Sequence, residues 1–322
     1  MKVCITHDIP GPAIQLLQDQ GFEVSLSIRK PLGRAELLEF VKGADAVIPI
    51  LTDKIDASVF EAAGPQLKIV ANYAIGFDNI DLEEAGRRGV AVTNTPSQTI
   101  TDAVAEHTLA LMMALAKNII AADKCVREGN YCGWDPNLLI GTQLLGKTLG
   151  IVGLGRIGTI VARLAVNGLG MRVIYTGPNR QEDFEKDFEA KFLPLDSLLA
   201  SSDFVTLHVP LTADTRHLIN GQKLSKMKKT AYLINTSRGP VVNEVDLVAA
   251  LKNGVIAGAA LDVFENETAV SPELRRLENV TLSPHIASAT KEAREEMSRI
   301  AADNVIAVLS GQKPINSAFI SP

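Results

Sequence analysis

The chain has 322 residues, of which 46% are hydrophobic and 21% charged, and its net charge is −5 at pH 7. This composition is ordinary for a globular protein of about two domains, the acidic balance argues against a nucleic-acid partner, and apolar runs such as 109–116 are too short for a membrane span. Cysteine and histidine show no metal or disulfide spacing, and the N-terminus lacks a secretory pattern, so we expect a cytoplasmic protein without a metal.

Strand-like and helix-like segments alternate along the first hundred residues. The strand-like segments are 1–6, 22–27, 44–51 and 67–76, and helical spacing marks 12–21 and 33–43. Such alternation is typical of βαβ units around a parallel sheet. Residues 1–98 are therefore predicted to form one small α/β domain.

A long helix is predicted next, over residues 99–129. Thr99 is a plausible N-cap, with an acidic residue three positions later, and Gly129 is a plausible stop. The segment is apolar around much of its circumference, which indicates burial between domains or subunits.

The alternation restarts at residue 147. Six short strands are predicted, at 148–155, 172–177, 203–210, 231–237, 256–264 and 280–285. This pattern is typical of a doubly wound dinucleotide-binding sheet. An amphipathic helix over 290–311 follows, and the tail 312–322 is expected to pack back on the first domain.

The sequence GLGRIG places glycines at 153, 155 and 158, between a strand-like and a helix-like segment. In a dinucleotide-binding turn the first glycine makes the bend, the second lets backbone approach the pyrophosphate, and the third lets helix and strand pack closely. The helix N-terminus then offers N–H donors to phosphate groups. A turn that serves packing alone, or one that binds a methyl donor, are weaker interpretations.

Three polar residues follow three late strands. Arg238, Glu267 and His285 come after the fourth, fifth and sixth predicted strands of this region. Ligands of open α/β sheets bind at the carboxyl ends of the strands, so these side chains are expected to converge. Arginine binds a carboxylate, histidine exchanges protons near neutral pH, and a carboxylate beside histidine stabilises its protonated form. The set suits reduction of a 2-keto acid.

The motifs GLGRIG, LINTSRGPVV, AGAALDVFE, LSPHIASAT and NYAIGFDNID resemble those of the D-isomer-specific 2-hydroxyacid dehydrogenases over nearly the whole chain. The resemblance implies an α/β fold in which a Rossmann-type doubly wound sheet is inserted into a smaller flavodoxin-like α/β domain. Residues 1–98 and 287–322 would form the substrate-binding domain and 99–286 the dinucleotide-binding domain, with the active site in the cleft between them. Within the family, the chain looks closest to the glyoxylate/hydroxypyruvate reductases, and a homodimer is expected.

The resemblance assigns roles to individual residues. It implies that Arg238 orients the substrate, His285 is the acid/base and Glu267 is its partner. The substrate-binding residues implied are Leu51, Ile75, Gly76 and Trp134, the last either closing the partner subunit's pocket or serving only as an interface aromatic. The cofactor-binding residues implied are Gly153, Gly155, Arg156, Ile157, Gly158, Thr176, Gly177, Asn179, Arg180, His208, Val209, Pro210, Thr215, Thr236 and, on the nicotinamide side, Asp262. One departure is Thr268, where many relatives have proline.

The cofactor preference is predicted from the end of the strand over 172–177, the second predicted strand of the dinucleotide-binding sheet. NAD-binding turns carry an acidic residue there, on the ribose 2′-hydroxyl, whereas this chain has Gly177. Asn179 and Arg180 add donors and a positive charge for a 2′-phosphate. The sequence therefore predicts NADPH as the preferred cofactor, with NADH as the alternative.

Several alternatives stay open. The GWDP loop and KPIN tail also resemble those of phosphite dehydrogenases, although Ile75 stands where those enzymes have lysine. A cofactor-sensing corepressor on the same fold is the main alternative outside the enzymes. His7, His107 and His217 are scattered singly and are interpreted as structural.

Overall fold

The computed structural model describes residues 1–28, 31–267 and 269–317; Thr268 and the end of the tail lie outside this part. The chain divides into two compact units, one formed by Met1–Ile100 with Ala289–Pro322 and the other by Thr101–Ser288. The sequence places the two boundaries after residues 98 and 286, and the structure places them two residues later, after 100 and 288. The fold class expected from the sequence, two α/β units with parallel sheets, is confirmed.

The first unit is built on a five-stranded parallel sheet in the order β2-β1-β3-β4-β5. This order is that of flavodoxin-like folds. Its strands are β1 Lys2–Ile5, β2 Glu23–Leu26, β3 Ala46–Ile48, β4 Ile69–Ala71 and β5 Ala91–Thr93, and its short helices are α1 Ala13–Asp19, α2 Arg34–Phe40, α3 Ala57–Ala63 and α4 Leu82–Arg88. The strands β1, β3 and β4 are buried almost throughout, as expected of a sheet covered on both faces.

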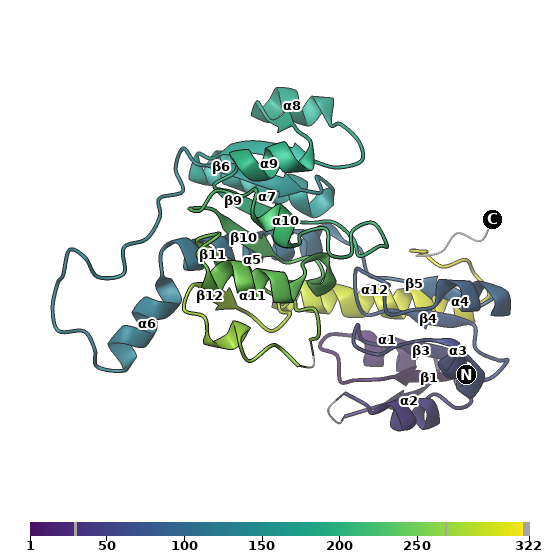
Figure 1. Cartoon of the computed structure of the whole chain (residues 1–322). Coiled ribbons are helices and arrows are strands. Elements are labelled where there is room, and N and C mark those ends of the chain that lie inside the picture. The colour runs from purple at the N-terminus through teal and green to yellow at the C-terminus, as the bar shows by residue number, and fades with distance from the viewer. Residues whose placement is uncertain (29–30, 268, 318–322) are drawn as a thin grey trace. The chain divides into compact units, whose positions relative to one another are not determined.

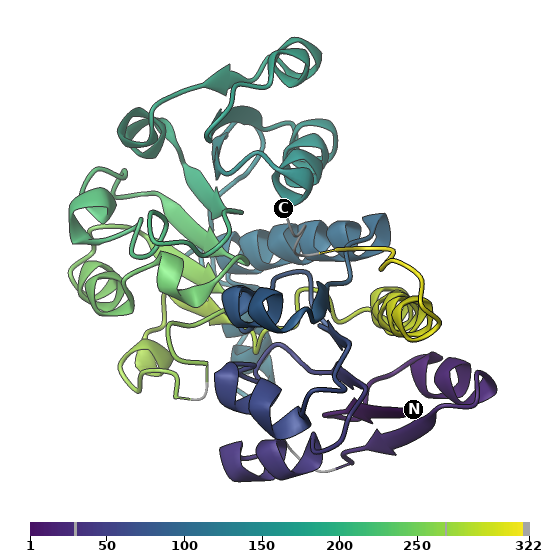
Figure 2. The same cartoon turned by 90° about the vertical axis from the view of Figure 1, so that its right-hand side faces the viewer.

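The C-terminal helix α12, Lys291–Leu309, returns to the first unit and packs against α1 and β4 (Figure 2). Its N-cap is Thr290, whose hydroxyl accepts the N–H of Ala293 at 3.1 Å. The described part of the tail, up to residue 317, packs back on this helix, because the N–H groups of Ile315 and Asn316 donate to Oδ1 of Asn304 at 2.9 and 3.0 Å. The remainder of the predicted arm, 318–322, lies outside the described residues. The first unit is thus assembled from both ends of the chain.

The second unit holds a seven-stranded parallel sheet in the order β12-β11-β10-β9-β6-β7-β8 (Figure 1). Its strands are β6 Thr148–Val152, β7 Arg172–Thr176, β8 Lys191–Phe192, β9 Phe204–Leu207, β10 Tyr232–Asn235, β11 Gly258–Leu261 and β12 Val280–Leu282. The sequence predicts six of these and misses the two-residue β8. The order reverses between β6 and β9, the switch point at which doubly wound sheets bind ligands.

Helices cover both faces of this sheet. They are α7 Arg156–Leu169, α8 Glu182–Phe188, α9 Leu195–Ser201, α10 Gly221–Leu224 and α11 Glu244–Lys252, with 3-10 turns η1 Gly239–Val241 and η2 Leu274–Arg276. Neighbouring residues along a strand enter different apolar clusters: Val152 and Val205 pack in one, and Ile151 and Phe204 in the other. This alternation gives the second unit a core on each side of its sheet.

The helix predicted over 99–129 is wrong as a single element. It is two helices, α5 Gln98–Ala116 and α6 Ile119–Arg127, separated at Asn118, which adopts a left-handed φ of +53°. The predicted N-cap is also wrong, because the N–H of Ile100 donates to Ser97 Oγ at 3.2 Å. Asparagine tolerates the left-handed conformation, which explains where the chain turns. Many side chains of α5 are buried, whereas α6 buries none.

Among the described residues, none of the helices combines the length and the apolar character that a membrane crossing requires. The cytoplasmic location stays a prediction.

Candidate active site

The turn after β6 needs glycine at two places. Gly153 has a φ of +98°, and a Cβ there would lie 2.9 Å from the carbonyl group of His208. A Cβ at Gly158 would lie 2.4 Å from the carbonyl oxygen of Gly153, so α7 can start this close to the turn only without a side chain. At Gly155 a Cβ would meet nothing within 4 Å, which leaves space before the first turn of α7. Phosphate groups bind in such a position.

Two further residues of the predicted set continue this turn. Arg156 is the first residue of α7 and is exposed, and Ile157 is half-buried against the core of the second unit. Thr176 ends β7, and its carbonyl oxygen accepts the N–H of Gly153 at 2.9 Å. The ends of β6 and β7 are therefore joined at the point where the turn begins.

Gly177 follows β7 with room beside it. A Cβ there would have only the backbone nitrogen of Leu154 near it, at 3.9 Å, which is ordinary van der Waals contact. Its φ is not in the left-handed region, so an aspartate could stand at this position. The lack of an acid at 177 is therefore a matter of chemistry rather than of space.

Asn179 and Arg180 are exposed beyond this strand end. The Arg180 guanidinium donates from Nε to both carboxylate oxygens of Glu185, at 2.8 and 3.0 Å, and from Nη2 at 2.7 Å. The Tyr175 hydroxyl also donates to Glu185, at 2.7 Å. These bonds, that of Arg180 foremost, lower the pKa of Glu185 to about 2. Sequence reasoning missed Glu185, which lies on α8 five residues after its partner.

The segment after β9 holds His208, Val209, Pro210 and Thr215. The Thr215 hydroxyl donates to the carbonyl of Pro210 at 2.6 Å, so it closes this loop on itself. Burial lowers the pKa of His208 to about 4, which keeps its ring neutral. Within the described part of the chain, the buried Nε2 of His208 has no hydrogen-bond partner.

Thr236 follows β10, and its hydroxyl lies 2.8 Å from that of Thr108 on α5. These residues, with the glycine turn, fit a dinucleotide on two observations. The turn leaves space before the N-terminus of α7, and the buried Nε2 of His208 beside it is a hydrogen-bonding atom still unsatisfied within the protein.

The three candidate catalytic residues follow neighbouring strands. Arg238 comes after β10, Glu267 after β11 and His285 after β12, and these strands are adjacent in the sheet. His285 Nδ1 lies 2.9 and 2.8 Å from the two carboxylate oxygens of Glu267. A carboxylate only accepts, so Nδ1 carries the hydrogen and Nε2 is the nitrogen that can exchange a proton with a substrate.

Arg238 lies on a turn that packs against the segment leading to Glu267. Its Nη1 donates to the carbonyl of Ser237 at 2.8 Å, and the side-chain amide of Asn235 donates to the backbone carbonyl of Arg238 at 3.0 Å. A Cβ at Gly239 would lie 1.7 Å from the carbonyl oxygen of Phe264, so the two backbones touch. Only glycine permits this approach, which fixes the Arg238 turn beside the residues that precede Glu267.

Asp262 directly follows β11 and is fully buried. Its Oδ1 accepts the N–H of Ile286 at 2.9 Å and the hydroxyl of Ser283 at 2.5 Å, and its Oδ2 accepts the N–H of Ala287 at 2.8 Å. Burial alone would raise the pKa of Asp262, but the nearby His107 side chain and these bonds lower it below its usual range. The carboxylate is therefore ionised and fixed beside His285.

In the first unit, the predicted substrate loop is held by asparagines. Ile75 and Gly76 are half-buried, and their carbonyl oxygens accept from the side-chain amides of Asn94, at 2.6 Å, and Asn72, at 2.8 Å. In a trans peptide the N–H points opposite to the C=O. The Asn94 bond therefore turns the N–H of Gly76 away from Asn94. Sequence reasoning identified the loop and missed both asparagines.

Leu51 lies on a turn beside this loop within the same unit. The turn is closed by the N–H of Asp53 on the carbonyl of Ile50, and Asn79 donates to the carbonyl of Asp53 at 3.0 Å. The buried Asp53 carboxylate accepts from the Thr6 hydroxyl at 2.5 Å and the N–H of Ile50 at 3.0 Å. Burial raises the pKa of Asp53 in spite of these bonds.

Trp134 lies on an extended loop after α6 and is 84% exposed (Figure 1). Helix α6 and the loop after it together form an arm. Other apolar side chains of this arm are also exposed: Ile119, Ile120, Val126, Tyr131, Leu138 and Ile140. The described part of the chain brings no group of three or more histidine, cysteine or acidic side chains into the arrangement a metal ion needs.

Comparison with known proteins adds to this geometry. Residues 109–287 match the model of the D-isomer specific 2-hydroxyacid dehydrogenase, NAD binding domain. A glyoxylate reductase of Korarchaeum cryptofilum is 48% identical over 98% of this chain and 95% of its own length.

Solved structures are similar over nearly the whole chain. A protein of Thermus thermophilus has a TM-score of 0.93 and 41% identity, covering 99% of this chain and 100% of its own. An NADPH-dependent glyoxylate/hydroxypyruvate reductase of Sinorhizobium meliloti, in complex with NADP and malonate, has a TM-score of 0.85 and 31% identity, covering 98% and 96%.

Proposed function

Because the chain belongs to the D-isomer specific 2-hydroxyacid dehydrogenases, which are oxidoreductases with a nicotinamide-cofactor domain, we propose that it reduces glyoxylate and hydroxypyruvate to glycolate and D-glycerate. The observation that carries the proposal is the hydrogen-bonded pair of His285, which follows β12, and Glu267, which follows β11. Arg238 follows β10, the next strand of the same sheet. The names of the relatives support the substrate class.

The residues of the second unit perform the proton chemistry. When bound, the cofactor supplies the hydride that reduces the keto carbon. His285, protonated at both nitrogens, gives the Nε2 proton to the carbonyl oxygen, while Glu267 holds Nδ1 and stabilises the imidazolium. Arg238 binds the carboxylate and polarises the carbonyl group.

The cofactor we propose is NADPH in preference to NADH. No carboxylate stands at Gly177 to repel a 2′-phosphate, although the backbone has room for one. The Arg180 side chain is 62% exposed, while the Glu185 side chain that it pairs with is only 13% exposed. The guanidinium is therefore held beyond the end of β7 and is still accessible to a 2′-phosphate, since an arginine carries five N–H donors. Thr176, Asn179, Thr215 and Thr236 are retained as cofactor contacts, and Asp262 as a contact on the nicotinamide side.

In the first unit we propose that the backbone N–H groups of Ile75 and Gly76 bind the substrate carboxylate and that Leu51 lines the pocket. Two hydrogen bonds support this proposal, because the N–H of a trans peptide points opposite to its C=O. The Asn94 bond to the Ile75 carbonyl orients the N–H of Gly76, and the bond from the N–H of Thr95 to the Ala74 carbonyl, at 2.9 Å, orients the N–H of Ile75. Phosphite is disfavoured as a substrate, since Ile75 offers no cation to a dianion.

We further propose a homodimer that covers α6 and the loop of Trp134. Scattered apolar residues on a surface are normal, but contiguous ones mark interaction sites. A second copy fits this arm, because none of the α6 side chains is buried within the chain. Light scattering after gel filtration tests this; a monomer at micromolar concentration would refute it.

The reductase proposal is tested by following NADPH and NADH oxidation with glyoxylate, hydroxypyruvate, pyruvate and phosphite, the last in the direction of NADP reduction. Turnover of glyoxylate or hydroxypyruvate with NADPH is the expected result. Binding of NADPH without turnover of any acid would favour the corepressor-like alternative.

A further inference from the structure

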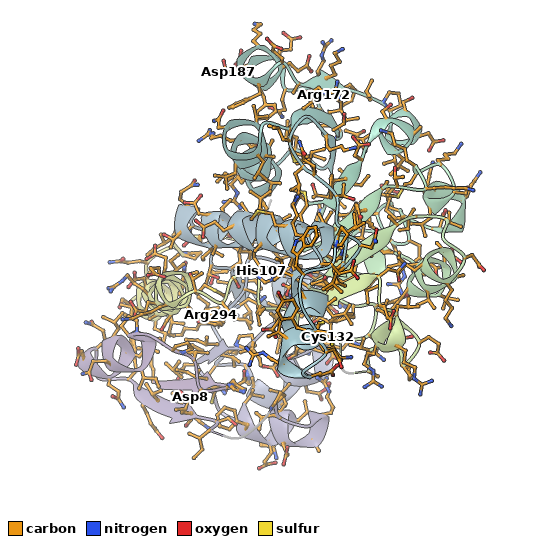
Figure 3. The ribbon with its side chains drawn as sticks, turned by 90° about the vertical axis from the view of Figure 1, so that its left-hand side faces the viewer. Asp8, His107, Cys132, Arg172, Asp187 and Arg294 are labelled. Carbon is orange, nitrogen blue, oxygen red and sulfur yellow. The ribbon has the colours of Figure 1, made fainter. Side chains whose placement is uncertain are left out.

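His107, labelled in Figure 3, lies on α5. Hydrogen bonds connect it to the candidate catalytic residues of the same unit. Its Nε2 lies 3.1 Å from Ser283 Oγ and 3.4 Å from Asp262 Oδ1. The Ser283 hydroxyl has one hydrogen, which it gives to the carboxylate of Asp262 at 2.5 Å. Ser283 must then accept from His107, so Nε2 of His107 carries a hydrogen. The three side chains form a directed chain, from His107 through Ser283 to Asp262.

Asp262, the last member of this series of hydrogen bonds, holds the backbone on both sides of the His285 side chain. The N–H groups of Ile286 and Ala287 both donate to the Asp262 carboxylate, and the N–H of His285 donates to the Asp262 carbonyl at 2.8 Å. His285 itself has a φ of +53°, in the left-handed region. A residue other than glycine holds this conformation at a cost of about 1–2 kcal/mol, so its surroundings must maintain it.

We propose that His107 and Ser283 are positioning residues, which orient the Asp262 carboxylate so that His285 stays aligned with Glu267. The inference rests on the proposed function, because His285 is an acid/base only in that reaction. His107 does not touch the reacting atoms in this role. It supplies one hydrogen bond to a buried network, and losing one partner of such a network leaves the others poorly satisfied.

A role in positioning differs measurably from one in packing. His107→Leu keeps an apolar body of similar size and removes the donor, whereas His107→Gln keeps an N–H donor at a similar reach. We expect His107→Leu and Ser283→Ala to lower kcat about tenfold, a fraction of what a 1 Å misplacement can cost. The KM for glyoxylate and the Kd for NADPH should stay near wild type, the Tm of these two variants should fall by no more than a few degrees, and His107→Gln should retain most of kcat.

Hydrogen exchange at the amides of Ile286 and Ala287, followed by NMR, gives a readout that needs no turnover. We expect slow exchange in wild type and His107→Gln, and faster exchange in His107→Leu and Ser283→Ala. If wild type reduces no keto acid, the proposed function fails, while the exchange data still test the chain of hydrogen bonds. Unchanged exchange in both variants, wild-type kcat in His107→Leu, or equal losses in the glutamine and leucine variants would each overturn the inference.

Discussion

Each unit has a buried aspartate beside residues assigned to the site, and the two carboxylates differ in how they are satisfied. Asp53 in the first unit accepts from one hydroxyl and one N–H, and burial raises its pKa. Asp262 in the second unit accepts from two backbone N–H groups and the Ser283 hydroxyl, with Nε2 of His107 3.4 Å away, and its pKa is lowered. Burial favours the neutral acid unless enough donors face the charge. The comparison teaches that the donors around a buried carboxylate, and not burial alone, decide the direction of its pKa shift.

The units also differ in what they offer a substrate. In the site that we propose, the second unit uses side chains at strand ends, Arg238, Glu267 and His285, whose types can be read from the sequence. The first unit uses the backbone N–H groups of Ile75 and Gly76. Their directions are set by the bonds that the Ala74 and Ile75 carbonyls accept from the Thr95 N–H and the Asn94 amide. We therefore expect substitutions in the second unit to change kcat and those in the first to change KM.

The largest effect is expected from His285→Gln. Removal of a general acid typically costs about 10²–10⁴ in rate, because no group then supplies the proton to the carbonyl oxygen. The kcat for glyoxylate reduction should fall by that amount, while the Kd for NADPH, measured by fluorescence quenching, stays near wild type. Glu267→Gln serves as the comparison and should cost less, since the histidine remains. Turnover of His285→Gln close to wild type would refute the assignment of the chemistry to this residue.

Gly177→Asp should have the next largest effect. Two like charges about 4 Å apart repel by about 1–4 kcal/mol, depending on how well water screens them. The ratio of kcat/KM for NADPH over that for NADH should therefore fall about tenfold or more. Gly177→Asn, of the same size and without charge, is the matched control. A ratio that falls equally in both variants would mean that the side chain acts by its volume, in conflict with the open space beside Gly177.

Asn94→Ala tests the first unit. Losing one hydrogen bond costs about 1 kcal/mol, so the KM for glyoxylate should rise about fivefold with little change in kcat. Asn253 is a matched control, because its exposed amide also donates to one backbone carbonyl, that of Ala249, at 2.9 Å. A fall in kcat with constant KM would contradict the division between the two units.

The sequence predicts the fold and the strand-end residues well, because both depend on local patterns. The glycines at 153 and 158 and the residues after β10, β11 and β12 can be located from spacing alone. It fails where a contact joins distant segments: Glu185 on Arg180 and His107 on Ser283 involve no motif. It also fails at Asn118, because a single left-handed residue divides α5 from α6 without interrupting the apolar pattern. His107 is interpreted as structural from the sequence because no other histidine or acid is spaced to suit it. Its partner Ser283 lies 176 positions away, and no sequence pattern links the two.

The smallest effect is expected in the pH dependence of stability, and its sign separates the two aspartates. The folded pKa of Asp53 lies above its unfolded pKa. Between these two pKa values the folded state binds more protons than the unfolded state, so the free energy of unfolding falls as pH rises. The folded pKa of Asp262 lies below it, so stability rises with pH there and is lost as pH falls through the folded pKa. Urea unfolding of Asp53→Asn and Asp262→Asn across acidic pH, each subtracted from wild type, should give differences of opposite slope. Equal slopes would mean that the two carboxylates do not differ in the way their donors indicate.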